Sequence, residues 1–358
     1  MISLPQITAP AESFAIGMPV EIGKIERELK RLWAEGGEKM TRASLINLAV
    51  YSEEPDSLQR NTQIVAAITE NHACRAIVIA IDPAGKESQI EAWIAAHCHV
   101  SRAGTKQVCS EQISFLFSEA TRPLLLNIVF SHLDSDLPFY LWWQGELHEV
   151  LNPQLWSWVD RLIYDSAEWS NIEAQLQLLD EAREEAKQRI VLCDLNWMRL
   201  VQVRLAIAQF FDTPAGQEQL ANISRVEITH APQYRSTALL LTGWLAAQLG
   251  WMLIEAADEN TFGFSDCAGE TMRVSFTEAE GEPISRCSLF CGDGEFRVVQ
   301  ETGADLLRAS SHYRGEERTH QLMPGGRNDP VSLAGEELMR GGPHRVYLRA
   351  LEAVRELF

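Results

Sequence analysis

The chain has 358 residues, of which 46% are hydrophobic and 23% charged, and its formal net charge at pH 7 is −19. This is ordinary globular composition, and the length favours two domains. The negative charge, without a basic stripe, argues against binding to nucleic acid or to an anionic membrane surface. The expected partners are therefore proteins or small molecules.

Targeting and cysteine patterns predict a cytoplasmic protein. Residues 1–19 lack the basic-then-apolar pattern of a signal peptide, and no apolar run approaches the ~20 residues that a membrane span requires. The nearest run, residues 238–251, is shorter and includes Thr242 and Gln248. The seven cysteines are odd in number and irregularly spaced, unlike a secreted disulfide framework.

The first half alternates between helical and strand-like patterns. Helices are predicted at residues 21–35, 57–71, 122–132, 153–159 and 171–189, and strands at residues 43–51, 75–81, 91–100, 111–117, 139–143 and 161–165. Strand, helix and strand joined by short links indicate βαβ units. We therefore expect an α/β domain over residues 1–190, with a mostly parallel or mixed sheet and helices on both faces.

The stretch DSDLPFYLWWQG, residues 134–145, is the most distinctive part of this domain. Phe139 to Trp143 form a run of strand-favouring aromatics, and Pro138 can open such a strand. Side chains alternate along a strand, so Trp142 and Trp143 are expected on opposite faces. They are interpreted either as core tryptophans or as interface residues. The carboxyl end, Trp143 to Glu146, is the first place to look for function.

The second half predicts a smaller α+β domain over residues 191–358. Residues 193–211 are predicted to be helical, another helix is expected to start at residues 212–214, and residues 235–249 should form a buried helix ending at Gly250. Strands are predicted at residues 223–229, 272–277, 284–290 and 295–300, the last two joined by a hairpin. A polar loop at residues 312–332 and a final helix at residues 346–357 complete the prediction.

Sequence motifs for catalysis and phosphate binding are absent. No GxxxxGK[ST] or GxGxxG follows a predicted strand, and there is no GxSxG. The acidic pairs at residues 53–54, 184–185 and 316–317 lie in charged, solvated surroundings. No catalytic constellation is thus assembled in the sequence, and we expect no catalytic residues and no cofactor.

Two groups of cysteine and histidine residues allow other interpretations. His97 and His99 share one strand face near Cys98 and Cys109, and half-exposed strand histidines are favoured there over a zinc site, so no metal site is expected. Cys287 and Cys291 are redox candidates. On one extended strand their α-carbons would be roughly 13 Å apart, too far for a disulfide, which favours two buried thiols unless a turn begins at Cys291.

Several segments, in this order, resemble the glucose-6-phosphate dehydrogenase assembly protein family (OpcA). The resemblance runs from about Arg42 onward and covers most of the chain. Its more specific parts are the paired tryptophans after LP in DLPFYLWWQGEL and the block DLNWMRL. The other segments are RAIVI, RPLLL, RLIYDS, AQFFD, ALLLTGWLAAQLGW and LAGEELMRGGPHRVYLRAL.

This resemblance implies a non-catalytic assembly factor or allosteric activator that binds glucose-6-phosphate dehydrogenase in the oxidative pentose phosphate pathway. In some members, redox control through carboxy-terminal cysteines and thioredoxin has been proposed, which makes thioredoxin a further partner to consider. The cysteine pair of those members has no clear match at Cys287 and Cys291. The alternatives are a sugar-phosphate-binding enzyme or sensor that uses the α/β domain, and an adaptor that only localises the dehydrogenase.

Binding to a protein partner requires exposed aromatic or arginine anchors. The candidate partner-binding residues are Trp142, Trp143, Glu146, Asp194, Trp197 and Arg199. Asp194 is interpreted either as a helix cap or as the salt-bridge partner of an arginine. Trp197 could equally be packed in the core at a capped helix start.

Overall fold

The first part of the chain is built on a mixed β-sheet. The computed structural model describes residues 16–36, 40–86, 88–100, 107–148, 153–342 and 344–358. The chain divides into two units of similar length. Unit 1 contains Met1–Tyr164 and Glu181–Val191, and unit 2 contains Asp165–Asp180 and Leu192–Phe358. The sequence predicts a second domain that is smaller than the first. Within the described residues, every helix is too short or too polar to cross a membrane.

The strands of unit 1 follow the order β1-β5-β6-β4-β3-β7-β8, with β2 beside β6. The inner neighbours β6, β4, β3, β7 and β8 are parallel, and β5 is antiparallel to β6. This mixed sheet confirms the predicted α/β class. Its strands are β1 (Met18–Pro19), β2 (Met40–Arg42), β3 (Ile46–Ser52), β4 (Cys74–Asp82), β5 (Glu91–Val100), β6 (Gln107–Ser118), β7 (Phe139–Trp143) and β8 (Arg161–Tyr164).

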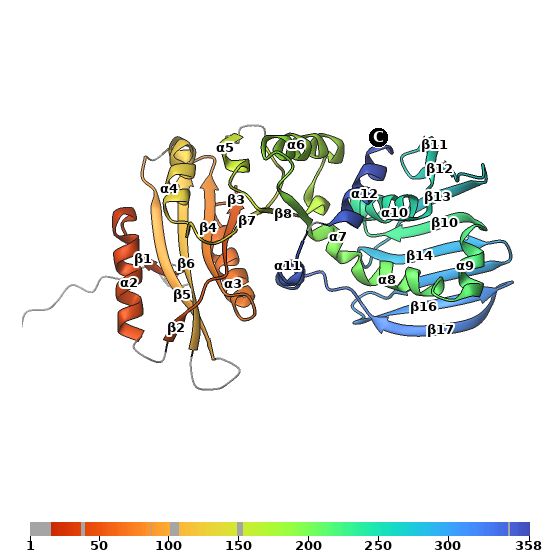
Figure 1. Cartoon of the computed structure of the whole chain (residues 1–358), viewed down its shortest axis with the longest axis horizontal. Helices are drawn as coiled ribbons and strands as arrows, with labels where there is room; N and C mark the ends of the chain where they lie inside the picture. The colour runs from red at the N-terminus through yellow and green to blue at the C-terminus, as the bar shows by residue number, and fades with distance from the viewer. Residues whose placement is uncertain (1–15, 37–39, 87, 101–106, 149–152, 343) are drawn as a thin grey trace, which may run out of the picture. The chain divides into compact units, whose positions relative to one another are not determined.

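Helices cover both faces of this sheet (Figure 1). On α3, the Thr62 hydroxyl accepts a hydrogen bond from Gln112, which is aligned with Ala76 on β4. Residues of α4 instead lie near Ile79, which points to the opposite face because side chains alternate along β4. The described helices of unit 1 are η1 (Ile22–Lys24), α2 (Ile25–Gly36), α3 (Ser57–Thr69), η3 (Glu119–Leu124), α4 (Leu125–Ser131) and α5 (Pro153–Trp156).

The aromatic strand β7 lies inside the sheet, between β3 and β8. Trp142 is aligned with Val50 and Trp143 with Tyr51, so the two indoles point to opposite faces, as predicted. Both are buried, with 3% and 2% of their surface exposed. Helices on both faces therefore enclose this strand, which explains why its sequence is apolar throughout.

Unit 2 contains a second sheet, in the order β11-β12-β13-β10-β14-β15-β16-β17. The pair β10 and β13 is parallel, and the other neighbours are antiparallel. The strands are β10 (Ile223–His230), β11 (Met252–Asp258), β12 (Thr261–Ser265), β13 (Thr271–Glu278), β14 (Ile284–Cys291), β15 (Gly294–Gln300), β16 (Leu306–Tyr313) and β17 (Glu316–Pro324).

The apolar helix α10 (Arg235–Leu249) has the bounds predicted from the sequence and ends at Gly250 in the left-handed conformation. It packs against β10 and against the terminal helix α12 (Arg345–Arg355) (Figure 1). The remaining elements of unit 2 are η4 (Ser166–Glu168), α7 (Leu195–Arg199), α8 (Val201–Phe210), α9 (Pro214–Leu220), η5 (Pro232–Tyr234) and α11 (Pro330–Met339), while α6 (Ile172–Glu185) and β9 (Val191–Asp194) contain residues of both units.

Two predictions for the second half are wrong. Residues 312–332, expected to be a loop, contain the end of β16, the strand β17 and the start of α11. The segment expected to be helical from Cys193 begins instead as the end of β9, and Asp194 then caps α7. The predicted helix start at Asp212-Thr213-Pro214 is confirmed, because the Thr213 side chain accepts a hydrogen bond from the Gly216 amide.

Candidate functional site

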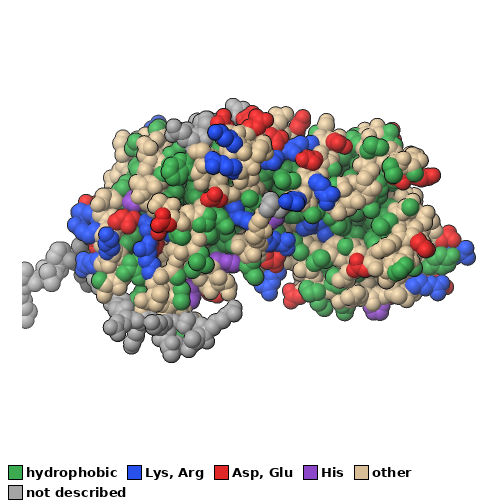
Figure 2. Space-filling model, in the orientation of Figure 1, with side chains coloured by type: hydrophobic (Ala, Val, Ile, Leu, Met, Phe, Trp, Pro, Cys, Tyr) green, Lys and Arg blue, Asp and Glu red, His purple; other side chains and the backbone are tan. Residues whose placement is uncertain are grey.

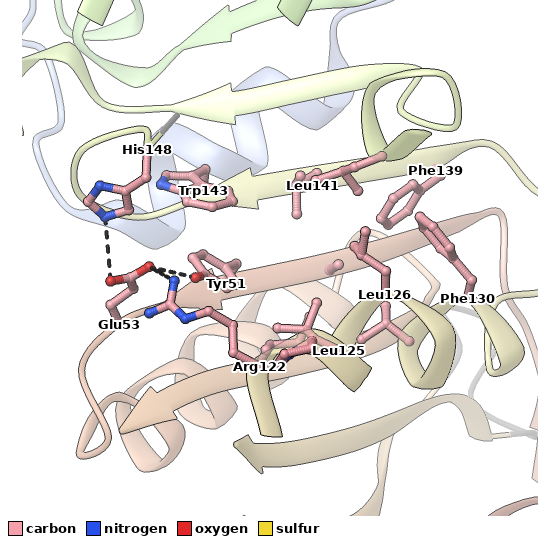
Figure 3. A pocket seen from close by; sticks show the side chains of 15 residues that line it. Tyr51, Glu53, Arg122, Leu125, Leu126, Phe130, Phe139, Leu141, Trp143 and His148 are labelled. Carbon is pink, nitrogen blue, oxygen red and sulfur yellow. Dashed lines mark hydrogen bonds and ion pairs between the residues drawn. The ribbon is translucent and has the colours of Figure 1, made fainter. Parts of the chain in front are cut away.

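Unit 1 contains a cavity of about 390 Å³ between the sheet and the helix α4 (Figure 3). Strands β3 and β7 form its floor, and η3 and α4 form its opposite wall. Most of the lining is aliphatic or aromatic, so the cavity is suited to an apolar molecule. The lining residues are Ala49, Tyr51, Glu53, Ile79, Arg122, Pro123, Leu125, Leu126, Val129, Phe130, Phe139, Leu141, Trp143, His148 and Leu155.

The position of this cavity in the sheet follows from the chain path. Strand β3 has β4 on one side and β7 on the other, so the chain leaves β3 in one direction and later returns on its opposite side. Such a reversal of strand order creates a crevice at the carboxyl ends of parallel strands, where α/β proteins bind ligands. Tyr51 and Trp143 lie at these ends, and their ring centroids are 4.0 Å apart.

A polar cluster occupies one end of the cavity. The Glu53 carboxylate accepts hydrogen bonds from the Tyr51 hydroxyl at 2.7 Å and from Arg122 Nη1 at 2.9 Å. His148 Nε2 lies 3.4 Å from the other carboxylate oxygen of Glu53. Figure 3 shows these side chains converging from β3, η3 and the segment after β7. Arg122 also donates to Glu119 at 2.9 Å.

The cluster shifts the proton affinities of its members. Burial alone would raise the pKa of Glu53, but the hydrogen bonds from Arg122 and Tyr51 outweigh it and lower that pKa. Burial and the hydrogen bond to Glu53 raise the pKa of Tyr51. Glu53 is therefore ionised and Tyr51 protonated at neutral pH.

This arrangement suits binding better than proton transfer. A general base works best with a pKa near the working pH, whereas the pKa of Glu53 is lowered and that of Tyr51 is raised away from neutrality. The cluster instead offers fixed hydrogen-bonding groups beside an apolar chamber. A molecule with an apolar body and a neutral or zwitterionic polar end fits this chemistry.

The candidate residues at the carboxyl end of β7 lie at different depths. Trp143 lines the cavity and donates a hydrogen bond from Nε1 to the Glu146 carbonyl at 2.8 Å, which fixes the turn after the strand. Trp142 points to the face that α3 covers. Glu146 is partly exposed. Contact of these residues with a protein partner stays a prediction.

The candidates in the DLNWMRL block belong to a buried network in unit 2. Asp194 caps α7, accepting from the Asn196 amide at 2.9 Å, and also accepts from the Ser166 hydroxyl at 2.7 Å. Arg199 pairs instead with Asp165, through bonds of 2.7 and 2.6 Å. The two interpretations of Asp194 are thereby separated: it is the cap, and the arginine's salt-bridge partner is Asp165.

Trp197 is 4% exposed and packs against two side chains of unit 2. Its ring centroid lies 5.3 Å from that of Tyr347, and the Arg204 guanidinium carbon lies 3.4 Å from the indole centroid. A packed indole with a cation on its face is a stabilising core arrangement. A role for Trp197 and Arg199 in partner binding stays a prediction.

The redox candidates Cys287 and Cys291 both lie on β14, without a turn that would bring their sulfurs together. Both are buried free thiols, and burial raises the pKa of each to about 12. Such thiols are poor nucleophiles at neutral pH. Their proposed redox role stays a prediction.

The group around His97 contains a disulfide that the sequence analysis did not predict. Cys98 and Cys109 lie opposite each other on β5 and β6 and are bonded through their sulfurs. His97 is hydrogen bonded to Gln112 at 2.8 Å and His99 to Thr69 at 3.2 Å. The cysteines considered as zinc ligands are therefore engaged with each other.

Sequence reasoning missed the polar cluster of the cavity. The sequence predicts a solvated acidic pair at Glu53, whereas the Glu53 side chain is 26% exposed and is bonded to Arg122 and Tyr51. Its position directly after a buried parallel strand was the available signal. His148 likewise follows the carboxyl end of a parallel strand, β7.

Solved structures resemble the chain loosely. An aldose-aldose oxidoreductase from Caulobacter crescentus is 9% identical, with a TM-score of 0.45, over 87% of this chain and 94% of that one. An NAD-binding protein from Listeria innocua is 9% identical, with a TM-score of 0.46, over 88% and 93%. Likeness at this level carries no information about activity.

Two curated relatives are cyanobacterial proteins described as the OxPP cycle protein OpcA. The Nostoc punctiforme protein is 28% identical over 202 residues, which are 55% of this chain and 42% of that protein. The Synechococcus elongatus protein is 24% identical over 316 residues, 82% of this chain and 70% of that protein. The match therefore spans less than half of the first relative.

Two sequence models of one family match the chain in consecutive regions. The N-terminal domain of the glucose-6-phosphate dehydrogenase subunit matches residues 65–181, and the C-terminal domain matches residues 190–351. Together these regions cover most of the chain, in the order of the family. The chain therefore belongs to the glucose-6-phosphate dehydrogenase subunit family, OpcA.

Proposed function

We propose that this protein acts in the oxidative pentose phosphate cycle by binding glucose-6-phosphate dehydrogenase as a non-catalytic assembly factor or allosteric activator. The observation that carries the proposal is that both halves of the chain match models described as a subunit of that dehydrogenase. The names of the two curated relatives support the same cycle.

The surface of the protein is compatible with a protein partner. Figure 2 shows acidic and basic side chains interspersed on the visible face, and no continuous basic stripe crosses the described residues of that face. The net charge of −19 disfavours nucleic acid as the alternative macromolecular partner. Apolar side chains lie among these charges, as protein interfaces require.

An activator of this kind must distinguish two states of the dehydrogenase. It can shift an equilibrium between oligomers, or between low-affinity and high-affinity forms, only by binding one form better than the other. A tenfold gain in substrate affinity requires a difference of about 1.4 kcal/mol in binding free energy between the two forms. Such a difference lies within the ordinary range of allosteric coupling.

The test is a titration of the full-length protein into purified glucose-6-phosphate dehydrogenase from the same organism. Light scattering follows the mass of the complex, and initial rates give the KM for glucose 6-phosphate and kcat at each ratio. We expect a stoichiometric complex and a saturable change in KM or oligomer size. An unrelated dehydrogenase serves as the specificity control.

The outcomes of this titration separate the proposed roles. A complex that changes neither kinetics nor oligomer size would indicate an adaptor that localises the enzyme. If neither a complex nor a kinetic change is found across the titration, the proposed function is wrong.

A second candidate function is small-molecule sensing through the unit 1 cavity. The cavity lies where α/β sheets bind ligands, and this position favours a function that includes binding of a small molecule. Its apolar walls match an apolar body better than the sugar phosphate considered from the sequence, because a phosphate buried there would lose its hydration.

The sensing function is testable without the dehydrogenase. N-phenyl-1-naphthylamine, an uncharged apolar dye, is expected to bind the cavity with one-to-one saturation and to change the tryptophan fluorescence, because Trp143 lines the cavity. Leu126→Trp, which fills the cavity, should abolish this binding. Leu124→Trp, at an exposed position on η3, should leave it intact. Equal binding by both variants would exclude the cavity as the site.

A further inference from the structure

Unit 2 contains a cluster of three side chains with different donor atoms. Cys193 lies on β9, Glu337 on α11, and His344 directly before α12. The Cys193 sulfur, a Glu337 carboxylate oxygen and a ring nitrogen of His344 all lie within 4.8 Å of one another. None of the three contributes to the cavity of unit 1.

The cluster is enclosed by the protein. Cys193 is 1% and Glu337 2% exposed, and the side chain of His344 is 12% exposed. Glutamate is rarely buried without a charged or hydrogen-bonding partner. Here His344 Nε2 lies 2.8 Å from Glu337 Oε1, so the carboxylate and imidazole are held together, and the thiol lies beside them.

The local backbone brings these residues together. The helix α11 ends two residues after Glu337, and Gly342 then adopts a φ of 76°, a left-handed conformation that favours glycine. This conformation accompanies the change of direction that places His344 beside the last turn of α11. Cys193 directly precedes Asp194, which is the last residue of β9 and the cap of α7.

We propose that Cys193, Glu337 and His344 bind a divalent transition metal ion, Zn²⁺ in the first instance, with water as the fourth ligand. Thiolate, imidazole and carboxylate are the three protein ligands that Zn²⁺ prefers. With bonds of about 2.0 to 2.3 Å in a tetrahedron, neighbouring ligand atoms lie about 3.5 Å apart. His344 Nε2 and Glu337 Oε1 lie 2.8 Å apart, and no two of the ligand atoms are more than 4.8 Å apart, so shifts of about 1 Å would give this geometry.

The charges of the proposed ligands balance those of the ion. Binding converts the thiol to a thiolate and releases its proton, while the imidazole stays neutral. Thiolate and carboxylate then carry two negative charges, which a divalent cation neutralises inside the protein. The ion would tie Cys193 to α11 and to the start of α12, and these three ligands all belong to unit 2. This role is independent of any partner of the protein.

The simpler interpretation is a buried hydrogen-bonded pair of Glu337 and His344 beside a neutral thiol. Both interpretations explain the burial, and they differ in whether the sulfur binds a metal. Cobalt substitution distinguishes them, because only a cobalt–thiolate bond gives an intense near-ultraviolet charge-transfer band, and tetrahedral Co²⁺ gives strong visible bands.

The experiment uses the untagged full-length protein, purified under reducing conditions, treated with a chelator and then titrated with Co²⁺. We expect one equivalent to produce both sets of bands, Zn²⁺ to remove them by competition, and Zn²⁺ to raise the melting temperature. Cys193→Ser should lose the charge-transfer band, and His344→Gln should lose tetrahedral binding. Cys267→Ser, at the exposed cysteine of the same unit, should behave as the wild type.

The wild-type titration decides the proposal even if the Cys193 or His344 variant fails to fold. If Co²⁺ gives no charge-transfer band in the folded wild-type protein, the proposal is wrong. The proposal is equally wrong if the band persists in Cys193→Ser or disappears in Cys267→Ser.

Discussion

Asp194 is a carboxylic acid without access to solvent, surrounded by hydrogen-bond donors. Burial and, secondly, the neighbouring charge of Asp165 raise its pKa to about 7, although the hydrogen bonds from Ser166 and Asn196 partly oppose this shift. The Tyr347 hydroxyl donates to the same carboxylate at 3.2 Å. The folded protein therefore holds a proton here at pH values where an unfolded chain has released it.

This pKa shift predicts a dependence of stability on pH. Because the folded pKa lies above the unfolded value of 3.8, the contribution of Asp194 is complete below about pH 4 and is lost as the pH rises to about 7. Asp194→Asn cannot ionise and should lack this decline. Between about pH 5.5 and pH 8, the wild type should lose about 2 kcal/mol relative to the variant.

Urea unfolding of both proteins across this pH range measures the difference. Tyr347→Phe serves as a control, because it removes a donor to Asp194 while keeping the carboxyl group. A stability difference between wild type and Asp194→Asn that stays constant with pH would show that Asp194 does not carry the raised pKa.

At the scale of elements, the pairing of β5 with β6 is fastened by the disulfide between Cys98 and Cys109, which are 11 residues apart in the sequence. Closing a loop of this length is expected to stabilise the protein by about 3 kcal/mol, mainly by restricting the unfolded chain. Oxidised protein should therefore unfold at higher urea concentration than protein treated with dithiothreitol. The Cys98→Ala/Cys109→Ala double variant should not respond to the reductant.

Thiol counting provides an independent check of the disulfide. The disulfide between Cys98 and Cys109 leaves five of the seven cysteines as thiols. Unfolded protein should therefore present five reactive thiols before reduction and all seven afterwards. Seven thiols before reduction, in protein purified without reductant, would contradict the disulfide.

The packing of α10 against α12 depends on Gly243. A β-carbon at this position would lie 2.4 Å from the Ala350 carbonyl oxygen and 2.5 Å from a methyl carbon of Val354. Gly243→Ala should therefore lower the free energy of unfolding by about 1 to 3 kcal/mol. The clash should outweigh the ~1 kcal/mol by which alanine favours a helix.

Chemical denaturation measures this loss, and Gly23→Ala is the matched control. A β-carbon at Gly23 would have no neighbour within 4 Å, so this variant should be neutral or slightly stabilised. If Gly243→Ala is as stable as the wild type, α10 and α12 do not approach each other as described.

At the scale of the molecule, the sequence predicts those elements whose own residues specify them. The helix α10 was predicted at its observed bounds because it is apolar on nearly all sides and stops at glycine. Strand β7 was predicted because aromatic residues favour an extended, buried backbone. In contrast, β17 is exposed at every residue except Met323, so no apolar alternation marks it. Its strand conformation comes from backbone pairing with β16.

The candidate site was predictable only in its location. The sequence points to the carboxyl end of β7, and Trp143 does line the cavity. The polar residues of the cavity are not predictable in this way. Glu53 and Arg122 are 69 residues apart in the sequence and meet only once α4 covers the sheet. The ligands of the proposed metal site come from segments more than 140 residues apart, which spacing rules cannot detect.

The net charge of the whole chain predicts a salt effect. Because the net charge is −19, negative side chains of the folded protein repel one another, and dissolved ions screen this repulsion. Raising sodium chloride from about 0.02 M to about 0.2 M at pH 7.5 should therefore raise the melting temperature. Near the isoelectric point of about 4.9 the effect should vanish. Equal salt effects at both pH values would exclude self-repulsion as the cause.

The division of the chain into units has a consequence for inheritance. The chain enters unit 2 at Asp165, returns to unit 1 at Glu181 and leaves again after Val191, and the helix α6 contains residues of both units. No single cut separates one unit from the other without transferring a piece between them. A recombination event with one breakpoint therefore could not replace either unit as a whole. Any fragment produced by a single cut between residues 165 and 191 therefore carries a segment of the other unit or lacks a segment of its own.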